Sequence, residues 1–337
     1  MKVNVKNHED NGASNFIGIS IINGDRKISF LNYGARVCEW IVPDKDGKHE
    51  DILLGHEDPT DYLVHPYYFG AAIGRTAGRI RNGEAVIGST PLKLTQNDGP
   101  HHLHGGSHGF DTLYFDHEIE EQEDRVSIIF NSTLDDMTDG YPGNLDIEIR
   151  YTYTEDDRLT IDYRITTDQE TLVNPTNHMY FNLNGDLKDD ILNHTVNFGN
   201  AEYGKVDEMV LPLGENGIIK SNEKTIAFRE LVESPDPQFS QFNGLDHPFM
   251  MTEESVVLST PNGRSIILES EDPVVVVFTS NDFNFSDATG RRFYPYCGLT
   301  LEAQMPPDDI NMNPSSKTIL PAGGTFAKRT VYQFNIQ

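Results

Sequence analysis

Residues 145–165 read LDIEIRYTYTEDDRLTIDYRI, and this stretch decides the fold class. Apolar or aromatic side chains occupy every second position from Leu145 to Tyr153, with polar side chains between them. After a polar turn at residues 155–158, the same alternation resumes from Leu159 to Ile165. A period of two places the apolar side chains on one face of a strand, and two such runs joined by a short polar turn predict an antiparallel hairpin.

The C-terminal half carries two further strand signals. Asn262-Gly263 lies between the apolar runs at residues 256–258 and 266–268, and this dipeptide favours the positive φ angles of a tight hairpin turn. Residues 274–278 read VVVVF, which is typical of a strand buried on both faces. These segments extend the β pattern well beyond the first hairpin.

Helical signals are short, and nothing divides the chain. The best helix candidates cover only residues 58–64 and 228–231, and there is no Ser/Gly-rich linker, low-complexity tract or visible repeat. A β sandwich can extend over this many residues as one domain. We therefore expect an all-β fold, a large antiparallel β sandwich, with residues 1–337 forming a single domain whose long loops carry the unusual residues.

Composition limits the partners and the compartment. The chain of 337 residues has 26 Lys and Arg against 53 Asp and Glu, a net charge of −27, which argues against nucleic acid and anionic membrane surfaces. The two cysteines, Cys38 and Cys297, lie far apart and in no metal-binding spacing. Neither a signal peptide nor an apolar run of roughly 20 residues is present, so we expect a cytoplasmic protein.

Two segments hold a candidate acid/base couple. Residues 176–182 read TNHMYFN and place His178 among amides and aromatic rings, and residues 299–304 read LTLEAQ and place Glu302 in a half-buried strand. A histidine and a partly desolvated carboxylate exchange protons near neutral pH. If the fold brings them together, the protein moves protons on a bound neutral molecule.

Three other segments carry polar groups whose roles the sequence leaves open. Residues 74–80 hold two arginines four apart among small residues, which suits either a ligand contact or a Gly-rich turn with solvated arginines, and no phosphate-loop pattern is present. The run at residues 101–106, HHLHGG, fits a metal site, a structural loop or a substrate contact through His104. Asp246 either accepts hydrogen bonds from a sugar or closes a turn.

Nucleophilic catalysis has little support. There is no Gly-x-Ser-x-Gly elbow, and neither cysteine has a basic or histidine-rich setting in the sequence. Glu302 and Asp246 could instead supply the two carboxylates of a glycoside hydrolase, so that class stays open.

Taken in order, these segments resemble the galactose mutarotase (aldose 1-epimerase) family, and the resemblance extends along nearly the whole chain from Asn32 onward. The segments that carry it are Gly74-Arg-Thr-Ala-Gly-Arg-Ile80, Leu103-His-Gly-Gly106, Gly109-Phe-Asp111, Gly140-Tyr-Pro-Gly143, Asn174-Pro-Thr-Asn-His-Met-Tyr-Phe-Asn182, Gly244-Leu-Asp-His247 and Leu301-Glu-Ala-Gln304 with Pro307, Asp308 and Asn311. The family fold is a large antiparallel β sandwich, in agreement with the alternation pattern.

The resemblance implies interconversion of the α and β anomers of a free aldose, without a cofactor or a metal. Glu302 matches the general base that takes the proton of the anomeric hydroxyl, and His178 matches the general acid that protonates the ring oxygen. His104, Arg79 and Asp246 match residues that hold the sugar. Within the matched motifs, Tyr180 and Gly78 complete the expected substrate-binding set. We expect Glu302 to help keep His178 protonated, in a cleft open to water.

The chain departs from the family pattern at the rim of the expected site. Gly78 stands where many members have Asn, Val276 where several have Gln, and Met305-Pro306 where some have Asn-Trp. These departures favour an altered sugar preference over lost chemistry.

The expected ligand is therefore a free sugar such as galactose, glucose or maltose, and the expected state is a monomer or weak homodimer. A carbohydrate-binding or sensing protein with the same fold is the main alternative, and a phosphosugar epimerase is disfavoured by the lack of an extra basic cluster near the motifs.

Overall fold

The computed structural model describes residues 1–9, 15–64, 67–199, 202–219, 225–251 and 255–337. It confirms the predicted hairpin: β13 (Leu145–Thr154) and β14 (Arg158–Thr167) pair antiparallel, with Tyr153 opposite Leu159. Side chains along β13 alternate between buried and more exposed positions, as the period of two requires. The hairpin lies inside a nine-stranded antiparallel sheet.

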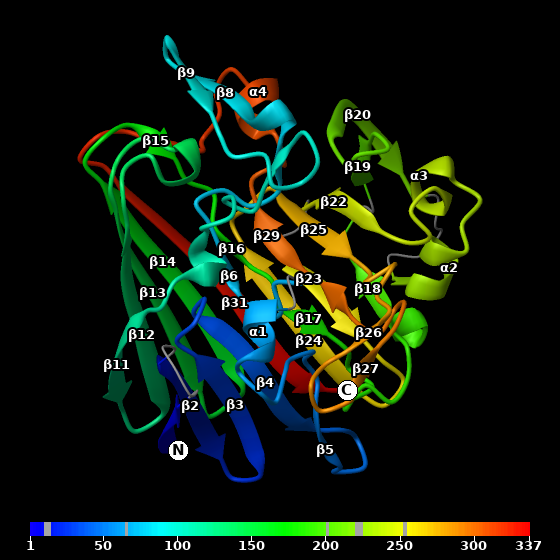
Figure 1. Cartoon of the computed structure of the whole chain (residues 1–337). Helices are drawn as coiled ribbons and strands as arrows, with labels where there is room; N and C mark the ends of the chain where they lie inside the picture. Colours follow the sequence, from blue (N-terminus) through cyan, green and yellow to red (C-terminus); the bar gives the residue numbers. More distant parts are fainter. Residues whose placement is uncertain (10–14, 65–66, 200–201, 220–224, 252–254) are drawn as a thin grey trace.

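This nine-stranded sheet is the largest in the described part of the chain (Figure 1). In spatial order its strands are β11 (Asp116–Glu121), β12 (Arg125–Leu134), β13, β14, β31 (Thr325–Ile336), β24 (Arg264–Ser270), β23 (Ser255–Ser259), β18 (Thr195–Asn197) and β21 (Ile226–Ala227). β23 and β24 form the second predicted hairpin, and Gly263 in its turn has φ +90°. The C-terminal strand β31 joins the two hairpins at the centre of the sheet.

Two five-stranded antiparallel sheets complete the main layers. The N-terminal sheet contains β1 (Lys2–Glu9), β2 (Asn15–Asn23), β3 (Arg26–Leu31), β4 (Arg36–Pro43) and β5 (His49–Asp51). The other, which we call the site sheet, contains in spatial order β20 (Pro212–Ile218), β19 (Glu202–Val206), β22 (Asp246–Met250), β25 (Val274–Phe278) and β29 (Glu302–Gln304). The first four residues of β25 are buried, as the run of valines predicts.

Short elements connect these layers. The two-stranded ladders are β6 (Ala72–Ile73) with β16 (Thr176–Asn177), β7 (Arg79–Ile80) with β10 (His102–Leu103), β8 (Glu84–Ile87) with β9 (Thr90–Lys93), β15 (Thr171–Leu172) with β30 (Ile319–Leu320), β17 (Tyr180–Phe181) with β28 (Leu299–Thr300), and β26 (Phe285–Ser286) with β27 (Arg292–Phe293). The helices are α1 (Asp61–Val64), α2 (Phe228–Val232), α3 (Pro237–Ser240) and α4 (Asp309–Met312), and single 3₁₀ turns cover Arg81–Gly83, Phe110–Thr112, Thr138–Gly140 and Ile191–Asn193. Both predicted helix positions are confirmed by α1 and α2.

The core lies between the nine-stranded sheet and the two smaller sheets. Phe30 of β3 packs on Tyr151 of β13, with ring centroids 5.2 Å apart, so the N-terminal sheet covers this part of the large sheet. Phe249 of β22 stacks at 4.2 Å on Phe198, which follows β18, so the site sheet covers the other end. Burial of each such ring contributes about 1.5–3 kcal/mol. The predicted antiparallel β sandwich is thereby confirmed.

Neither cysteine is bonded to another: Cys38 is half-buried and Cys297 is buried, and both are free thiols. Within the part of the chain that the structure describes, no helix has the length and apolar character that spanning a membrane requires.

Candidate active site

All seven residues that the sequence assigned to the site line one cavity of about 360 Å³. Its floor is the outer face of the site sheet, where residues directly opposite each other on neighbouring strands point the same way. On this face Asp246 lies opposite Phe278, and Val276 lies between Pro248 and Glu302. The floor is therefore apolar at its centre and carries a carboxylate on each side.

His178 enters the cavity from the turn between β16 and β17. The Asn177 side chain fixes this turn, because its Oδ1 accepts from the Met179 amide at 3.0 Å and its Nδ2 donates to the Gly70 carbonyl at 3.1 Å. The backbone of His178 is tied on both sides, by bonds from its amide to Ala71 and from the Gly70 amide to its carbonyl. The neighbouring asparagine thus aims the imidazole at the floor.

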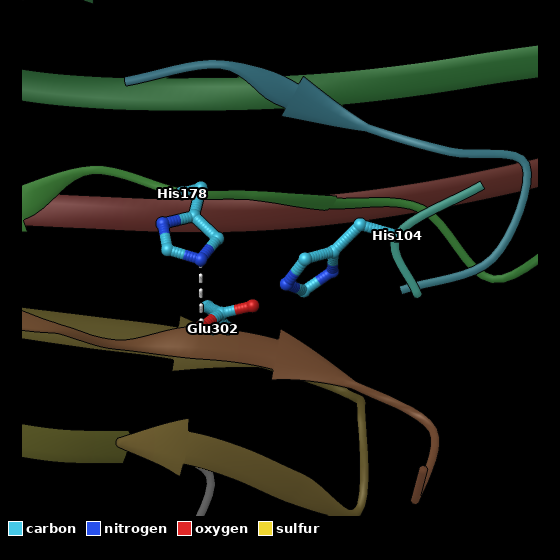
Figure 2. Close-up of side chains that lie close together, drawn as sticks. All are labelled: His104, His178 and Glu302. Atoms are coloured by element: carbon cyan, nitrogen blue, oxygen red, sulfur yellow. Dashed lines mark ion pairs between the residues drawn. The ribbon is translucent and has the colours of Figure 1, made fainter. Parts of the chain in front are cut away.

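The structure brings the predicted acid and base into contact. His178 Nε2 lies 3.4 Å from Glu302 Oε1, and the Thr300 hydroxyl donates to the same carboxylate oxygen at 3.0 Å. Figure 2 shows the imidazole directly above the carboxylate. Thr300 and Glu302 are two apart in the sequence, on the successive short strands β28 and β29, and the hydroxyl holds the carboxylate in place through this hydrogen bond.

Burial determines the protonation of this pair. The Glu302 side chain is 3% exposed and that of His178 is 5% exposed, so both groups are buried at the base of the cavity. Desolvation raises the pKa of Glu302 to about 8 and lowers the pKa of His178 to about 3. The expectation that Glu302 keeps His178 protonated is wrong, because burial disfavours both charged forms.

The pair nevertheless holds the proton that acid/base chemistry needs. Because burial raises the pKa of Glu302 and lowers that of His178, the proton lies on Glu302 near neutral pH and both groups are neutral. A carboxylate with an imidazolium contains the same number of protons, so transfer across the 3.4 Å contact converts one form into the other. No proton has to enter from solvent.

His104 is held as a hydrogen-bond donor. The Gly78 amide donates to His104 Nδ1 at 3.3 Å, so the neutral ring carries its proton on Nε2. Burial lowers the pKa of His104 well below its ordinary value, which keeps the ring neutral. Figure 2 shows its ring directed toward His178 and Glu302. The following Gly105 has φ +88°, and a Cβ there would overlap the Gly74 carbonyl, which explains the glycine at this position.

The metal interpretation of the histidine run is weakened by these bonds. His104, His178 and Glu302 offer ligand atoms within 4.8 Å of one another, but the tautomer of His104 presents an N–H rather than a lone pair to the cavity. His101 Nδ1 accepts from the Asn82 amide at 3.0 Å, and His102 bonds both the Thr95 carbonyl and the Tyr141 hydroxyl. The two preceding histidines are structural, and of the three histidines in the run only His104 lines the cavity.

The two arginines of residues 74–80 differ in role. Arg75 is fully buried and donates to the carbonyls of residues 135, 142 and 143, so it supports the loop and is not solvated. Arg79 faces the cavity, donates from Nε to Asp98 at 2.7 Å and lies 3.7 Å from Asp246 through Nη1. Asp98 positions the guanidinium, and sequence reasoning missed it because no motif surrounds it.

The rim at Gly78 is closed by other side chains. With φ +74°, a Cβ on Gly78 would lie 3.0 Å from Pro307 Cβ and 3.2 Å from Gln304 Nε2. These two residues therefore occupy the space beside the glycine, and both line the cavity. Sequence reasoning did not assign Gln304 to the site, although the period of two places it on the same face of β29 as Glu302.

A buried lysine outside the cavity holds its two walls together. Lys328 of β31 donates from Nζ to the carbonyls of Pro175 and Ala303, both at 2.7 Å, and pairs with Asp272 at 2.6 Å. Pro175 precedes the turn that carries His178, and Ala303 follows Glu302 on β29. This ammonium group therefore ties the segment that carries His178 to the strand that carries Glu302.

The fold is a large antiparallel β sandwich, and its cavity holds a buried His–Glu pair beside an Arg–Asp pair, which are the residue types that an enzyme using acid/base chemistry on a hydroxylated ligand requires. Residues 18–333 match the aldose 1-epimerase family, and the chain belongs to that family of isomerases. Curated relatives extend over almost the same length.

Two curated relatives and one solved structure illustrate the similarity. Galactose mutarotase of Mus musculus is 31% identical over 92% of this chain and 91% of its own, and aldose 1-epimerase of Escherichia coli (strain K12) is 30% identical over 93% of both. The crystal structure of galactose 1-epimerase from Lactobacillus acidophilus NCFM superposes with a TM-score of 0.88, at 28% identity and 99% coverage of both chains.

Proposed function

We propose that this protein interconverts the α and β anomers of a free aldose, with Glu302 as general base and His178 as general acid. The observation that carries the proposal is the 3.4 Å contact between these two groups at the base of the cavity. Support comes from the family to which the chain belongs.

The reaction requires two coordinated proton transfers. Glu302 takes the proton of the anomeric hydroxyl as His178 protonates the ring oxygen, which breaks the bond from C1 to that oxygen and leaves an aldehyde at C1. Rotation about the C1–C2 bond presents the other carbonyl face, and reclosure returns both protons by the reverse transfers. The pair ends each turnover with the single proton it began with, so either anomer can enter next.

Before catalysis the proton must move from Glu302 to His178. Arg79 favours this step, because its charge lowers the pKa of Glu302 against the larger effect of burial. The Nε2–H of His104 donates to an oxygen of the sugar near the site of ring opening. The Arg79 charge thereby stabilises the Glu302 carboxylate, and the His104 N–H dipole stabilises charge that forms on the sugar oxygen.

Arg79 and Asp246 bind the remaining hydroxyls, and Tyr180 and Gly78 shape the cavity around the ring. Among the described lining residues Arg79 is the only Lys or Arg, and its charge is already matched by Asp98 and Asp246. This balance favours a neutral sugar such as galactose or glucose over a phosphorylated one.

Polarimetry or anomer-resolved NMR on freshly dissolved α-galactose and α-glucose tests the proposal. We expect mutarotation well above the buffer rate, and a loss of at least about 100-fold in kcat in Glu302→Gln. Rates equal to buffer across a panel of aldoses, with sugar binding still seen by calorimetry, would instead identify a carbohydrate-binding protein.

We also propose that residues 1–337 fold as one domain. Support comes from a single cluster of buried side chains that contains Ile19 and Phe334 and joins all three large sheets.

A further inference from the structure

Outside the cavity of the candidate active site, a second group of metal-ligating side chains converges in the part of the chain that the structure describes. His56, Asp61 and Asp287 each offer one ligand atom, and these atoms lie within 4.8 Å of one another. His56 lies before α1, Asp61 is the first residue of α1, and Asp287 follows β26 in the turn to β27. All three residues are more than nine-tenths buried, and the proposed reaction uses none of them.

The imidazole of His56 is held with one nitrogen toward Asp287. Its Nδ1 lies 3.5 Å from Asp287 Oδ2, and both side chains are fully buried. The His56 amide donates to the Tyr62 hydroxyl at 3.0 Å, and the ring packs against Phe69 and Phe293 with centroids 5.2 and 5.5 Å away. These contacts fix the direction of Nδ1, and a neutral imidazole with its proton on the other nitrogen presents a lone pair there.

The turn after β26 supplies one carboxylate and contacts the other. Asp287 Oδ1 accepts from the amides of Thr289 and Arg291, both at 3.0 Å, and from the Thr289 hydroxyl at 2.7 Å. Asp287 Oδ2 is the oxygen that faces the imidazole. Asp61 accepts from the amide of Ala288, the residue next to Asp287, through both oxygens at 3.3 and 3.2 Å. Two segments far apart in the sequence thus bring both carboxylates to one buried imidazole.

Charge and ligand type favour one kind of ion at this cluster. Two ionised carboxylates carry two negative charges, and one imidazole supplies at most one positive charge. Buried charges are stable when they are paired or coordinate a metal, and a divalent cation matches both carboxylates while the imidazole stays neutral. Zn²⁺ binds imidazole nitrogen together with carboxylate oxygen, whereas Ca²⁺ and Mg²⁺ are bound through oxygen. One histidine with two aspartates therefore favours Zn²⁺.

From this arrangement we propose that His56, Asp61 and Asp287 bind one structural Zn²⁺, which joins the segment of α1 to the turn between β26 and β27. His56 also lines a second cavity, of about 320 Å³, beside the N-terminal sheet, and this cavity gives an ion a path to the cluster. Phe285 of β26 stacks at 4.3 Å on Tyr67, which lines the cavity of the candidate active site. The ion therefore braces one wall of that cavity and takes no part in the proposed proton transfers.

Elemental analysis and thermal unfolding test the proposal. The full chain is expressed with added zinc, passed through gel filtration and compared with protein dialysed against a chelator. Wild-type protein is expected to retain one zinc per chain by elemental mass spectrometry. Adding Zn²⁺ back to the dialysed protein at about 100 times its Kd is expected to raise Tm by about 4 °C for a chain of this length. Ca²⁺ and Mg²⁺ at the same concentration are expected to leave Tm unchanged.

Asp287→Asn removes one ligand and keeps the Oδ1 that accepts from the turn. This variant is expected to bind zinc at least about 100-fold more weakly and to lose most of the rise in Tm. Asp61→Asn is expected to behave in the same way. Glu302→Gln is the matched control, because it alters the other group of close ligand atoms, and it is expected to keep both the zinc and the rise in Tm.

Three results overturn the zinc site. A wild-type protein that retains no zinc and shows no rise in Tm identifies the cluster as a buried ion pair between an imidazolium and the two carboxylates. Zinc retained equally by wild type and by Asp287→Asn places the ion elsewhere on the chain. Loss of zinc in Glu302→Gln, with zinc kept in both Asn variants, assigns the ion to the candidate active site. None of these measurements depends on sugar turnover, so they stand apart from the test of the proposed function.

Discussion

Replacing Glu302 by Gln should abolish catalysis and stabilise the folded protein. The carboxyl is almost fully buried, and its pKa rises from 4.5 in an ordinary setting to about 8 in the folded chain. A group whose folded-state pKa is raised contributes its full stability only below its unfolded pKa, and this contribution is lost as pH rises through the folded pKa. The neutral amide removes this pH-dependent cost.

The size of the effect follows from the two pKa values. Above pH 4.5 the carboxyl ionises in the unfolded chain but stays protonated in the folded chain up to about pH 8, and this difference lowers the stability of the folded protein. The loss is about 3 kcal/mol at pH 7 and about 1 kcal/mol at pH 5. Gln keeps the shape of the protonated acid, and its Oε1 still accepts from the Thr300 hydroxyl that now bonds Glu302. The variant should therefore exceed wild type in stability by an amount that grows with pH.

Urea unfolding of both proteins at pH 5, 7 and 8.5, with mutarotation rates on the same samples, measures this difference. The pKa of His178 is lowered, so the contribution of His178 to stability is lost only as pH falls below 6.5. It therefore does not obscure the effect of Glu302 on stability at pH 7 and 8.5. Glu121→Gln, at an exposed glutamate, is the matched control and should show no such trend. A Glu302→Gln protein that is no more stable than wild type at pH 8.5 would refute the reasoning.

Three further results are expected. Above pH 8 kcat/KM should fall, because Glu302 then loses the proton that the pair shares, and a buffer-corrected profile flat from pH 7 to 10 contradicts this. Lys328→Met should lower kcat at least about tenfold with little change in KM, because it removes the hydrogen bond to Ala303 that holds the strand of the proposed base. Steady-state kinetics, with Lys328→Arg as the control variant, test this prediction. Arg79→Lys should raise KM about tenfold, since an ammonium cannot reproduce the bond to Asp98, and an unchanged KM removes Arg79 from the binding site.

The sequence predicted the layers of the fold because alternation is a local signal. In the hairpin at residues 145–165 and the strand at residues 274–278, a few consecutive residues are enough to predict which side chains are buried. The residues at the base of the site came instead from resemblance, since no local pattern states that residues 178 and 302 meet. Contacts between distant segments, such as Lys328 with Pro175, leave no mark on the sequence around either residue.

Protonation was the least predictable property. The motif around His178 indicates an acid/base group, but the sign of its pKa shift depends on how completely the loops around it exclude water. Tyr68 and His104 pack on its ring from a different part of the chain, with centroids 5.5 and 5.2 Å away. Such enclosure is a property of the assembled pocket.

The position of β31 affects how the protein is made. This strand, residues 325–336, pairs with β14 on one side and β24 on the other (Figure 1). A ribosome synthesises it after both neighbours, so the two halves of the large sheet expose unpaired edges until it emerges. Exposed strand edges invite association with other chains. The nascent chain is thus exposed to aggregation until β31 has been made, and the strand that then covers both edges also carries Lys328, the lysine behind the candidate site.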